Sequence, residues 1–205
     1  MQIDLLRHGA CEGGAIFRGS TDVPLTAEGW QHMAGGLKKL QGPWQSIVCS
    51  PLIRCRAFAE GLATNSNVSL RVDAGIREMS FGDWEGLQVE SVWQEHEALC
   101  LAWSRAPDQV TPPAGEAYTH FKGRVLNSVL TLVQEYRASE KVLLITHGGV
   151  IKLLLNIARG ESPAGMMQLN VGYGFAASIK IVAPTFNANT VHILAPGETE
   201  YVYQS

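Results

Sequence analysis

The fold is decided by the stretch Ile3-Asp4-Leu5-Leu6-Arg7-His8-Gly9 near the start of the chain. Its apolar run stops abruptly at polar residues, which is typical of a buried strand that delivers polar side chains to its carboxyl end. A second run of this kind, Lys141–Ile145, leads into Thr146-His147-Gly148-Gly149 and then into an apolar helical segment. Two such strands predict a sheet with a polar edge.

Outward from these two runs, strand and helix patterns alternate along the chain. Further strands are predicted at 46–49, 68–72, 175–182 and 190–194. Helices are predicted after the capping residue Thr26, over 52–63 and 150–158, and along the apolar stripe from Phe121 to Tyr136. The first helix is expected to bury Trp30, Met33, Ala34, Leu37 and Leu40. This alternation predicts an α/β fold, a three-layer α/β/α sandwich with a mostly parallel central sheet.

Length and composition fit one globular domain over residues 1–205. The chain is 46% hydrophobic and 17% charged, which is ordinary for a folded protein and too apolar for disorder. It contains neither an internal repeat nor a linker-like change of composition. We expect the irregular, aromatic stretch 84–113 to be a helical and loop insertion over the edge of the sheet that carries the polar residues.

Charge and cysteine usage exclude several classes of protein. The net charge of −3 gives no basic field for nucleic acid. Charged residues interrupt the apolar runs at Asp4, Arg7 and Lys152, so neither a signal peptide nor a membrane span is expected. The four cysteines have the spacing of neither a zinc site nor a disulfide framework. We therefore expect a cytoplasmic protein with buried thiols, without metal or other cofactor, and we keep a homodimer open as its assembly.

The candidate site lies where the predicted strands end. Potential cations follow three of these strands: Arg7 and His8, Arg54, and His147. In such a sheet, ligands bind beyond the carboxyl ends of the strands. Converging cations would repel one another without an anion, so we expect a phosphate between them, with Gly9 and Gly148 letting backbone amides approach its oxygens. Each residue alone has an ordinary structural explanation, and their joint placement favours the site.

Five segments, in order, carry a family resemblance. They are Leu6–Gly9, Gly19–Gly29, Ser50–Arg54, Glu78–Gly86 and Thr146–Val150. Together they resemble the signatures of the histidine phosphatase superfamily, the phosphoglycerate mutase-like enzymes. The resemblance runs from residue 3 to about residue 158. It implies the phosphoglycerate mutase-like fold and a small phosphate monoester as the substrate.

The resemblance also implies a role for each matching residue. It makes His8 the nucleophile that becomes phosphorylated, Glu78 the proton donor and acceptor, and Arg7, Arg54 and His147 the phosphate pocket. Monoester hydrolysis can require roughly 10²¹-fold acceleration, which calls for a nucleophile, a cationic clamp and a leaving-group acid together. We expect the two arginines to lower the pKa of His8, so that it is neutral and nucleophilic.

Other polar residues near these segments allow two interpretations. Asp83, Glu85 and Glu12 are rival carboxylates for the role of the acid. On chemistry alone Glu78 is preferred only slightly, because Asp83 and Glu85 lie in the same loop, where they could instead be turn-forming or capping groups. The family position selects Glu78. Arg18 either reaches the outer phosphate oxygens or the rest of the substrate, or is a solvated loop arginine.

Three residues depart from the family pattern. Where many relatives have Thr and Asn after the Arg-His-Gly signature, this chain has Cys11 and Gly14, and Phe58 replaces a Thr that usually follows the clamp arginine. The departures put substrate fit and rate in question. Cys11 is either an oxidation-sensitive thiol with a lowered pKa or an inert small side chain.

A finer resemblance concerns the substrate. It rests on Glu78–Glu85, Trp93, Trp103, Pro113–Glu116, Phe121 and Arg124-Val125. These segments resemble the alpha-ribazole phosphatase branch, which removes the 5′-phosphate from alpha-ribazole phosphate during assembly of the nucleotide loop of cobalamin. The alternatives are a broad-specificity sugar or nucleotide phosphatase, a phosphoglycerate mutase, for which the chain is short, and a non-catalytic module that binds phospho-ligands.

Overall fold

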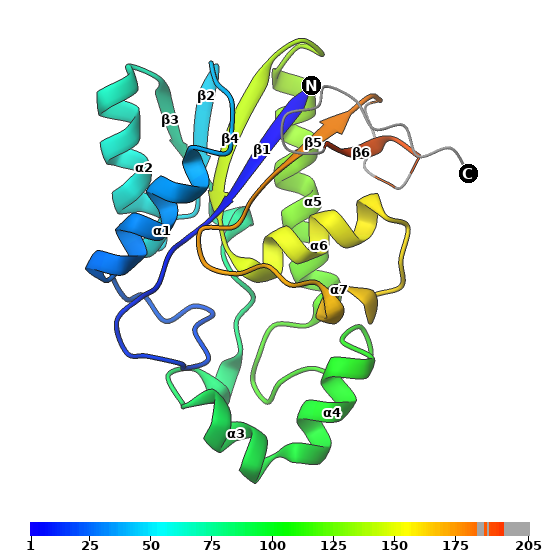
Figure 1. Ribbon diagram of the computed structural model, residues 1–205. Helices are drawn as coiled ribbons and strands as arrows, with labels where there is room; N and C mark the ends of the chain where they lie inside the picture. Colours follow the sequence, from blue (N-terminus) through cyan, green and yellow to red (C-terminus); the bar gives the residue numbers. More distant parts are fainter. Residues whose placement is uncertain (184–186, 188, 195–205) are drawn as a thin grey trace.

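The computed structural model describes residues 1–183, 187 and 189–194, and these form a sheet with the strand order β3-β2-β4-β1-β5-β6 (Figure 1). The strands are β1 (Gln2–Arg7), β2 (Ser46–Cys49), β3 (Ser69–Val72), β4 (Lys141–Thr146), β5 (Ala176–Ile181) and β6 (Val191–Leu194). Strands β1 to β4 are mutually parallel, whereas β5 runs antiparallel to β1, and β6 antiparallel to β5. The predicted strands and the mostly parallel sheet are confirmed.

Helices cover both faces of this sheet. They are α1 (Ala27–Leu37), α2 (Ile53–Ser66), α3 (Val89–Glu95), α4 (Glu97–Arg105), α5 (Tyr118–Glu135), α6 (Gly148–Ala158) and α7 (Gly165–Gln168). Alternate residues of β4 separate the layers, because Leu143 joins the core of α1 and α2 while Leu144 joins that of α5 and α6. The α/β/α sandwich is therefore as predicted. In the described part of the chain, none of these helices is long and apolar enough to cross a bilayer.

Helix α1 starts as predicted but faces the core differently. The hydroxyl of Thr26 accepts a hydrogen bond from the N–H of Gly29 at 3.0 Å, which caps the helix. The buried residues are Gly29, Met33 and Gly36. The prediction that Trp30 and Ala34 point inward is wrong, and Trp30 is 43% exposed. A Cβ on Gly29 would lie 2.0 Å from the carbonyl oxygen of Ala10, so this close backbone approach turns the glycines inward.

Residues 84–113 contain α3, α4 and the end of the short 3-10 turn η2 (Gly82–Trp84). Figure 1 shows α3 and α4 away from the sheet, across from the carboxyl ends of β1 and β4. Val89 of α3 and Trp103 of α4 line the pocket described below. This segment thus forms part of the wall of that pocket.

Candidate active site

The register of β1 against β4 brings the two histidines together. Arg7 pairs with Thr146, so the residues that follow, His8 and His147, lie side by side with ring centroids 5.3 Å apart. Arg54, in the first turn of α2, donates from Nε to Nδ1 of His147 at 3.3 Å. The three strand ends therefore converge as the sequence predicts.

His8 is held in one tautomer. Its ring is buried, and Nδ1 lies 2.8 Å from the carbonyl oxygen of Gly9. A carbonyl oxygen only accepts hydrogen bonds, so Nδ1 carries the hydrogen and the lone pair of Nε2 is left free. Burial lowers the pKa of His8 well below its ordinary value, and the charges of Arg7 and Arg54 lower it further. A neutral imidazole of this kind is a nucleophile.

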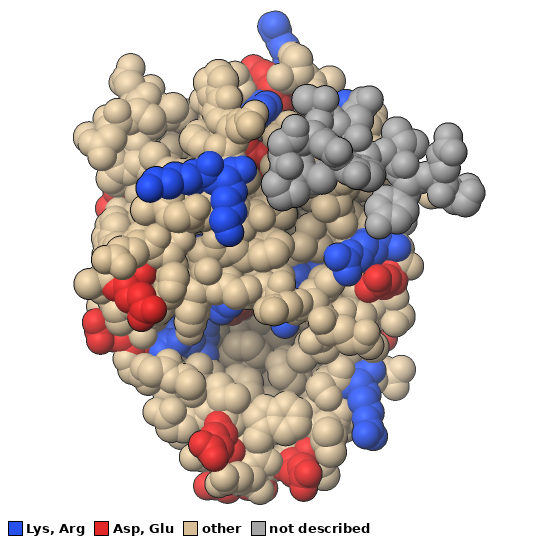
Figure 2. Space-filling view, in the orientation of Figure 1, with Lys and Arg blue, Asp and Glu red and all other residues tan. Residues whose placement is uncertain are grey.

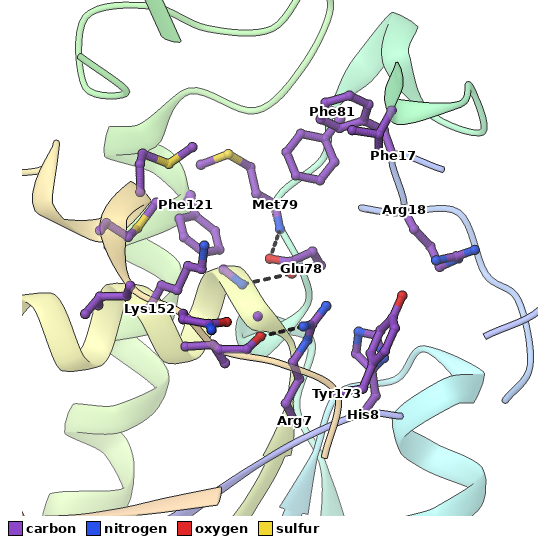
Figure 3. Close-up of a pocket in the computed structure, with 18 of the residues that line it drawn as sticks. Arg7, His8, Phe17, Arg18, Glu78, Met79, Phe81, Phe121, Lys152 and Tyr173 are labelled. Carbon is purple, nitrogen blue, oxygen red and sulfur yellow. Dashed lines mark hydrogen bonds between the residues drawn. The ribbon is translucent and has the colours of Figure 1, made fainter. Parts of the chain in front are cut away.

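His8 lines a pocket of about 300 Å³. Figure 2 shows this face hollowed, with Lys and Arg side chains near the hollow. We call Arg7, His8, Arg18, Glu78 and Gly148 the polar half of the pocket, and Phe17, Met79, Phe81, Trp103, Phe121 and Met166 its apolar half. In Figure 3, Arg7 and His8 lie on one side, Phe81 and Phe121 on the other, and Glu78 between them.

Arg7 reaches the start of α6 because Gly148 has no side chain. A Cβ on Gly148 would lie 3.1 Å from Nε of Arg7. Nη1 of Arg7 donates to the carbonyl oxygen of Val171 at 2.5 Å, and the guanidinium carbon lies 4.6 Å from the centroid of the Tyr173 ring. Nε is buried and has no hydrogen-bond partner among the residues that the structure describes. An anion in the pocket would satisfy this donor, whose isolation is otherwise unfavourable.

Glu78 enters the pocket from the loop after η1 (Ala74–Ile76). One carboxylate oxygen accepts the N–H of Met79 and the other that of Gly149, both at 3.0 Å (Figure 3). A Cβ on Gly149 would lie 2.3 Å from Oε1 of Glu78. The second glycine after His147 thus makes room for the carboxylate at the start of α6, where backbone N–H groups are free to donate.

The rival carboxylates do not line this pocket. Glu85 accepts hydrogen bonds from the N–H groups of Gly19, Ser20, Thr21 and Phe81, and from the hydroxyl of Thr21. Burial alone would raise the pKa of Glu85, but these hydrogen bonds outweigh it and the pKa is lowered. Asp83 and Glu12 are exposed. Glu85 is therefore an anchor between two loops.

Arg54 and His147 are fully buried, and neither lines the pocket. The guanidinium of Arg54 donates to the carbonyl oxygens of Thr21 at 2.7 Å and Gly19 at 2.8 Å. Because Nδ1 of His147 accepts from Arg54, its Nε2 carries the hydrogen and donates to Oγ of Ser50 at 2.7 Å. Burial, followed by the charge of Arg54, lowers the pKa of His147 well below its ordinary value. Direct phosphate contact by these two residues stays a prediction.

The glycine after His8 has a different use from the one predicted. A Cβ on Gly9 would lie 1.9 Å from the carbonyl oxygen of Gly29, so its absence permits packing against α1. The carbonyl of Gly9 orients His8. Gly9 is absent from the pocket lining, and its predicted approach to a phosphate stays untested.

Arg18 is part of the pocket wall. Its Nη2 donates to the carbonyl oxygens of Glu12 and Gly14, both at 2.7 Å. Gly14 has a φ of +70°, a conformation that glycine adopts easily. The glycine that departs from the family pattern therefore belongs to the turn that holds Arg18.

The other two departures lie outside the pocket lining. Burial raises the pKa of Cys11, although Arg54 and Arg18 oppose the shift, so the expectation of a lowered pKa is wrong. Its Sγ donates to the carbonyl oxygen of Gly9 at 3.3 Å. Phe58 packs on Trp30 with ring centroids 5.6 Å apart, between α2 and α1. The four cysteines are buried and free, as predicted.

Two pocket residues were not recognised from the sequence. Lys152 of α6 lines the pocket and makes neither a hydrogen bond nor an ion pair with any described residue (Figure 3). Burial and then Arg7 lower its pKa, while Glu78 opposes the shift. A lysine inside an apolar helix directly after His-Gly-Gly was the available signal. Tyr173, which covers Arg7 and is 41% exposed, belongs to no motif.

The polar half combines the groups that phosphate-ester chemistry requires. His8 supplies a neutral imidazole, Arg7 and Arg18 supply positive charge, and Glu78 supplies a carboxyl group. Over the described ranges, no cluster of three or more His, Cys, Asp or Glu side chains is placed to hold a metal ion.

Comparison with known proteins agrees with this geometry. The model of the histidine phosphatase superfamily (branch 1) matches residues 3–195. The adenosylcobalamin/alpha-ribazole phosphatase of Escherichia coli K12 is 27% identical, over 88% of this chain and 90% of its own length. "Probable phosphoglycerate mutase GpmB" of Klebsiella pneumoniae is 31% identical, over 78% and 75%. The crystal structure of the alpha-ribazole phosphatase from Shigella flexneri superimposes with a TM-score of 0.78 and 24% identity, over the full length of both chains. The chain belongs to the histidine phosphatase superfamily, branch 1.

Proposed function

We propose that this phosphatase hydrolyses alpha-ribazole 5′-phosphate through a phosphohistidine on His8. Nε2 of His8 attacks phosphorus, the bond to the alcohol oxygen breaks, and Glu78 gives that oxygen a proton. Water then attacks the phosphohistidine and gives a proton back to Glu78. Inorganic phosphate leaves, and both side chains return to their starting states.

The fixed tautomer of His8 carries this proposal. The bond from Nδ1 to Gly9 reserves Nε2 for the substrate, and burial keeps the ring neutral. The unpartnered Nε of Arg7 and the cationic Arg18 suit an anion beside that nitrogen. Positive groups fixed where charge develops are the largest source of catalysis for such reactions. A module that only binds phosphate would need neither a reserved nucleophile nor a carboxyl group opposite it.

The apolar half supports a leaving alcohol that carries an aromatic ring system. The rings of Phe17 and Phe81 lie 5.1 Å apart, and those of Phe81 and Trp103 lie 5.8 Å apart. Such a wall suits the benzimidazole of alpha-ribazole, since edge and face contacts between aromatic rings are favourable. Lys152 and Asn170 supply polar groups in the same wall for oxygen or nitrogen acceptors of the alcohol. The E. coli relative is named for this substrate.

The test is a phosphatase screen combined with rapid-quench labelling. Alpha-ribazole phosphate, sugar phosphates, phosphoglycerates and nucleotides are compared by kcat/KM, with p-nitrophenyl phosphate as a generic substrate. We expect alpha-ribazole phosphate to be preferred, and acid-labile phosphate to appear on the wild type but not on His8→Ala. The exposed His120 offers the matched control, because His120→Ala also removes an imidazole.

Each of the other outcomes would indicate a different activity for this protein. Full activity in His8→Ala rejects the nucleophile. Isomerisation of 3-phosphoglycerate with retained phosphohistidine would identify a mutase, the activity named in the K. pneumoniae relative. Similar rates on all substrates indicate a broad-specificity phosphatase, and binding without labelling indicates a non-catalytic module. Undiminished activity in EDTA is expected, since no step uses a metal.

A further inference from the structure

Arg124 of α5 has every guanidinium hydrogen engaged around the loop that carries Glu78. Nε and Nη2 donate to the two carboxylate oxygens of Glu116, both at 2.7 Å. Nη1 donates to the carbonyl oxygens of Gly75 at 2.8 Å and Arg77 at 2.7 Å. Nη2 also donates to the carbonyl oxygen of Glu78 itself at 2.9 Å. These contacts use all five donors of the side chain.

Glu116 holds the loop on the other side of Glu78. Its N–H donates to the carbonyl oxygen of Ser80 at 2.9 Å, and its carboxylate accepts the N–H of Ser80 at 3.4 Å. Hydrogen bonds from Arg124 and Glu116 thus hold the backbone both before and after Glu78. Only the short turn η1 precedes this loop, so helix or sheet pairing does not fix residues 77–81.

The segment also has no room to shift towards α5. A Cβ on Gly75 would lie 1.9 Å from Oγ of Ser128 and 3.0 Å from the carbonyl oxygen of Arg124. Close contact with α5 and the hydrogen bonds from Arg124 of the same helix together restrict the position of the loop. Arg124 and Glu116 are both largely buried, with side chains 19% and 18% exposed, so their ion pair is shielded from solvent screening.

We propose that Arg124 and Glu116 are positioning residues for Glu78, which place its carboxyl group for proton transfer to the leaving alcohol. The inference rests on the proposed function, because it needs Glu78 to be the acid. Neither residue lines the pocket, so each acts through the backbone of residues 75–80. General acid catalysis contributes about 10²- to 10⁴-fold, and a misplacement of about 1 Å can forfeit about 10²-fold.

The dependence of kcat/KM on the leaving group distinguishes a positioning role of Arg124 and Glu116 from a merely structural one. An alkoxide needs protonation as it departs, whereas p-nitrophenolate is stable without it. The ratio kcat/KM reports only steps up to release of the alcohol, so the later use of Glu78 as a base does not affect it. A misplaced acid therefore lowers kcat/KM for poor leaving groups selectively, while general loosening of the fold lowers it for all substrates.

The experiment measures kcat/KM for aryl and alkyl phosphates with leaving alcohols of graded pKa. In Arg124→Met and Glu116→Gln, we expect about 10- to 100-fold loss for alkyl phosphates and less than about 3-fold loss for p-nitrophenyl phosphate. Glu78→Gln should show the same selectivity with a larger amplitude. Glu116→Gln keeps the shape of the side chain and serves if Arg124→Met does not fold.

A double-mutant cycle tests whether Arg124 acts through Glu78. Adding Arg124→Met to Glu78→Gln should cause no further loss, because the acid is already absent. The control is Arg71→Met, which removes an arginine paired to Asp73 and Glu135, the latter on the same helix. That arginine donates to none of the carbonyls of residues 75–78.

Two failures are distinguishable. If Glu78→Gln shows no dependence on the leaving group, Glu78 is not the acid and the proposed function itself is wrong. If Glu78→Gln shows the dependence while Arg124→Met and Glu116→Gln lose activity equally on all substrates, only the positioning role is overturned. Additive losses in the double variant overturn it as well.

Discussion

The polar and apolar halves of the pocket are built in different ways. The polar half is built around the end of β1 and the start of α6, where a Cβ on Gly148 would lie 3.1 Å from Arg7 and one on Gly149 would lie 2.3 Å from Glu78, so larger residues there would displace these side chains. The apolar half draws Phe121 from α5, and further residues from a loop, α4 and α7. Its members contact through ring edges and flexible methionine chains, which tolerate replacement. Under the proposed function, the chemistry would be tied to backbone register, whereas recognition of the alcohol would be tied to packing that can change independently.

The largest effect is expected from replacing Arg7, the arginine beside His8 in the polar half. Arg7→Met keeps the length of the side chain and removes its charge beside His8. Every substrate presents the same phosphate, so we expect kcat/KM to fall about 10²- to 10³-fold on all of them equally. Arg105→Met, at an exposed position of α4, is the control for loss of one charge. A loss confined to alpha-ribazole phosphate would contradict the division.

Two buried histidines, His8 of the polar half and His147 behind it, should also make the fold sensitive to acid. Unfolded His8 and His147 take up protons near pH 6.5, whereas burial lowers both pKa values in the folded state. Below about pH 6.5 the unfolded state binds more protons than the folded state. The free energy of unfolding therefore has its full value above about pH 6.5 and decreases as the pH falls below it. The decline is at most about 1.4 kcal/mol per histidine per pH unit.

Urea unfolding at pH 7.5 and 5.5 measures this decline. The free energy of unfolding at pH 7.5 exceeds that at pH 5.5, and this difference should be smaller in His147→Gln, because one buried histidine is gone. The exposed His120 is the control, and His120→Gln should keep the wild-type difference. An unchanged difference in His147→Gln would show that His147 is not a source of the acid sensitivity.

The features of the site and the fold are predictable from the sequence to different degrees, for a physical reason. An apolar run that stops at Arg7-His8-Gly9 or at His147-Gly148 is a local pattern, and parallel strands bring such ends together. The contact of Glu78 with Gly149 joins residues 71 positions apart, and no local period encodes it. The prediction of which face of α1 is buried was wrong for a similar reason. Close backbone contact at Gly29 outweighed the apolar pattern that favoured burial of Trp30.

A smaller effect is expected at Lys152, the charged side chain that lines the pocket together with the apolar half. Lys152→Met keeps the length of the side chain but removes its hydrogen-bond donors. Loss of a charged hydrogen bond of about 1.5–3 kcal/mol should raise KM for alpha-ribazole phosphate about 10- to 100-fold. Glycerol phosphate, which is too short to fill this half, should be unaffected. Lys39→Met, at an exposed position, is the control. Equal changes for both substrates would assign Lys152 to the scissile phosphate.

The smallest effect tests the aromatic wall by itself. Phe81→Leu preserves apolar bulk but loses the ring that contacts Phe17 and Trp103. Aromatic pairs contribute about 0.5–1.5 kcal/mol, so KM for alpha-ribazole phosphate should rise about 3- to 10-fold with kcat unchanged. Phe175→Leu, which is partly buried against the core and outside the pocket lining, is the matched control. Because Phe81 lies three residues after Glu78, a fall in kcat for alkyl phosphates would show that the wall also positions the acid. The two halves would then be one unit joined through residues 78–81.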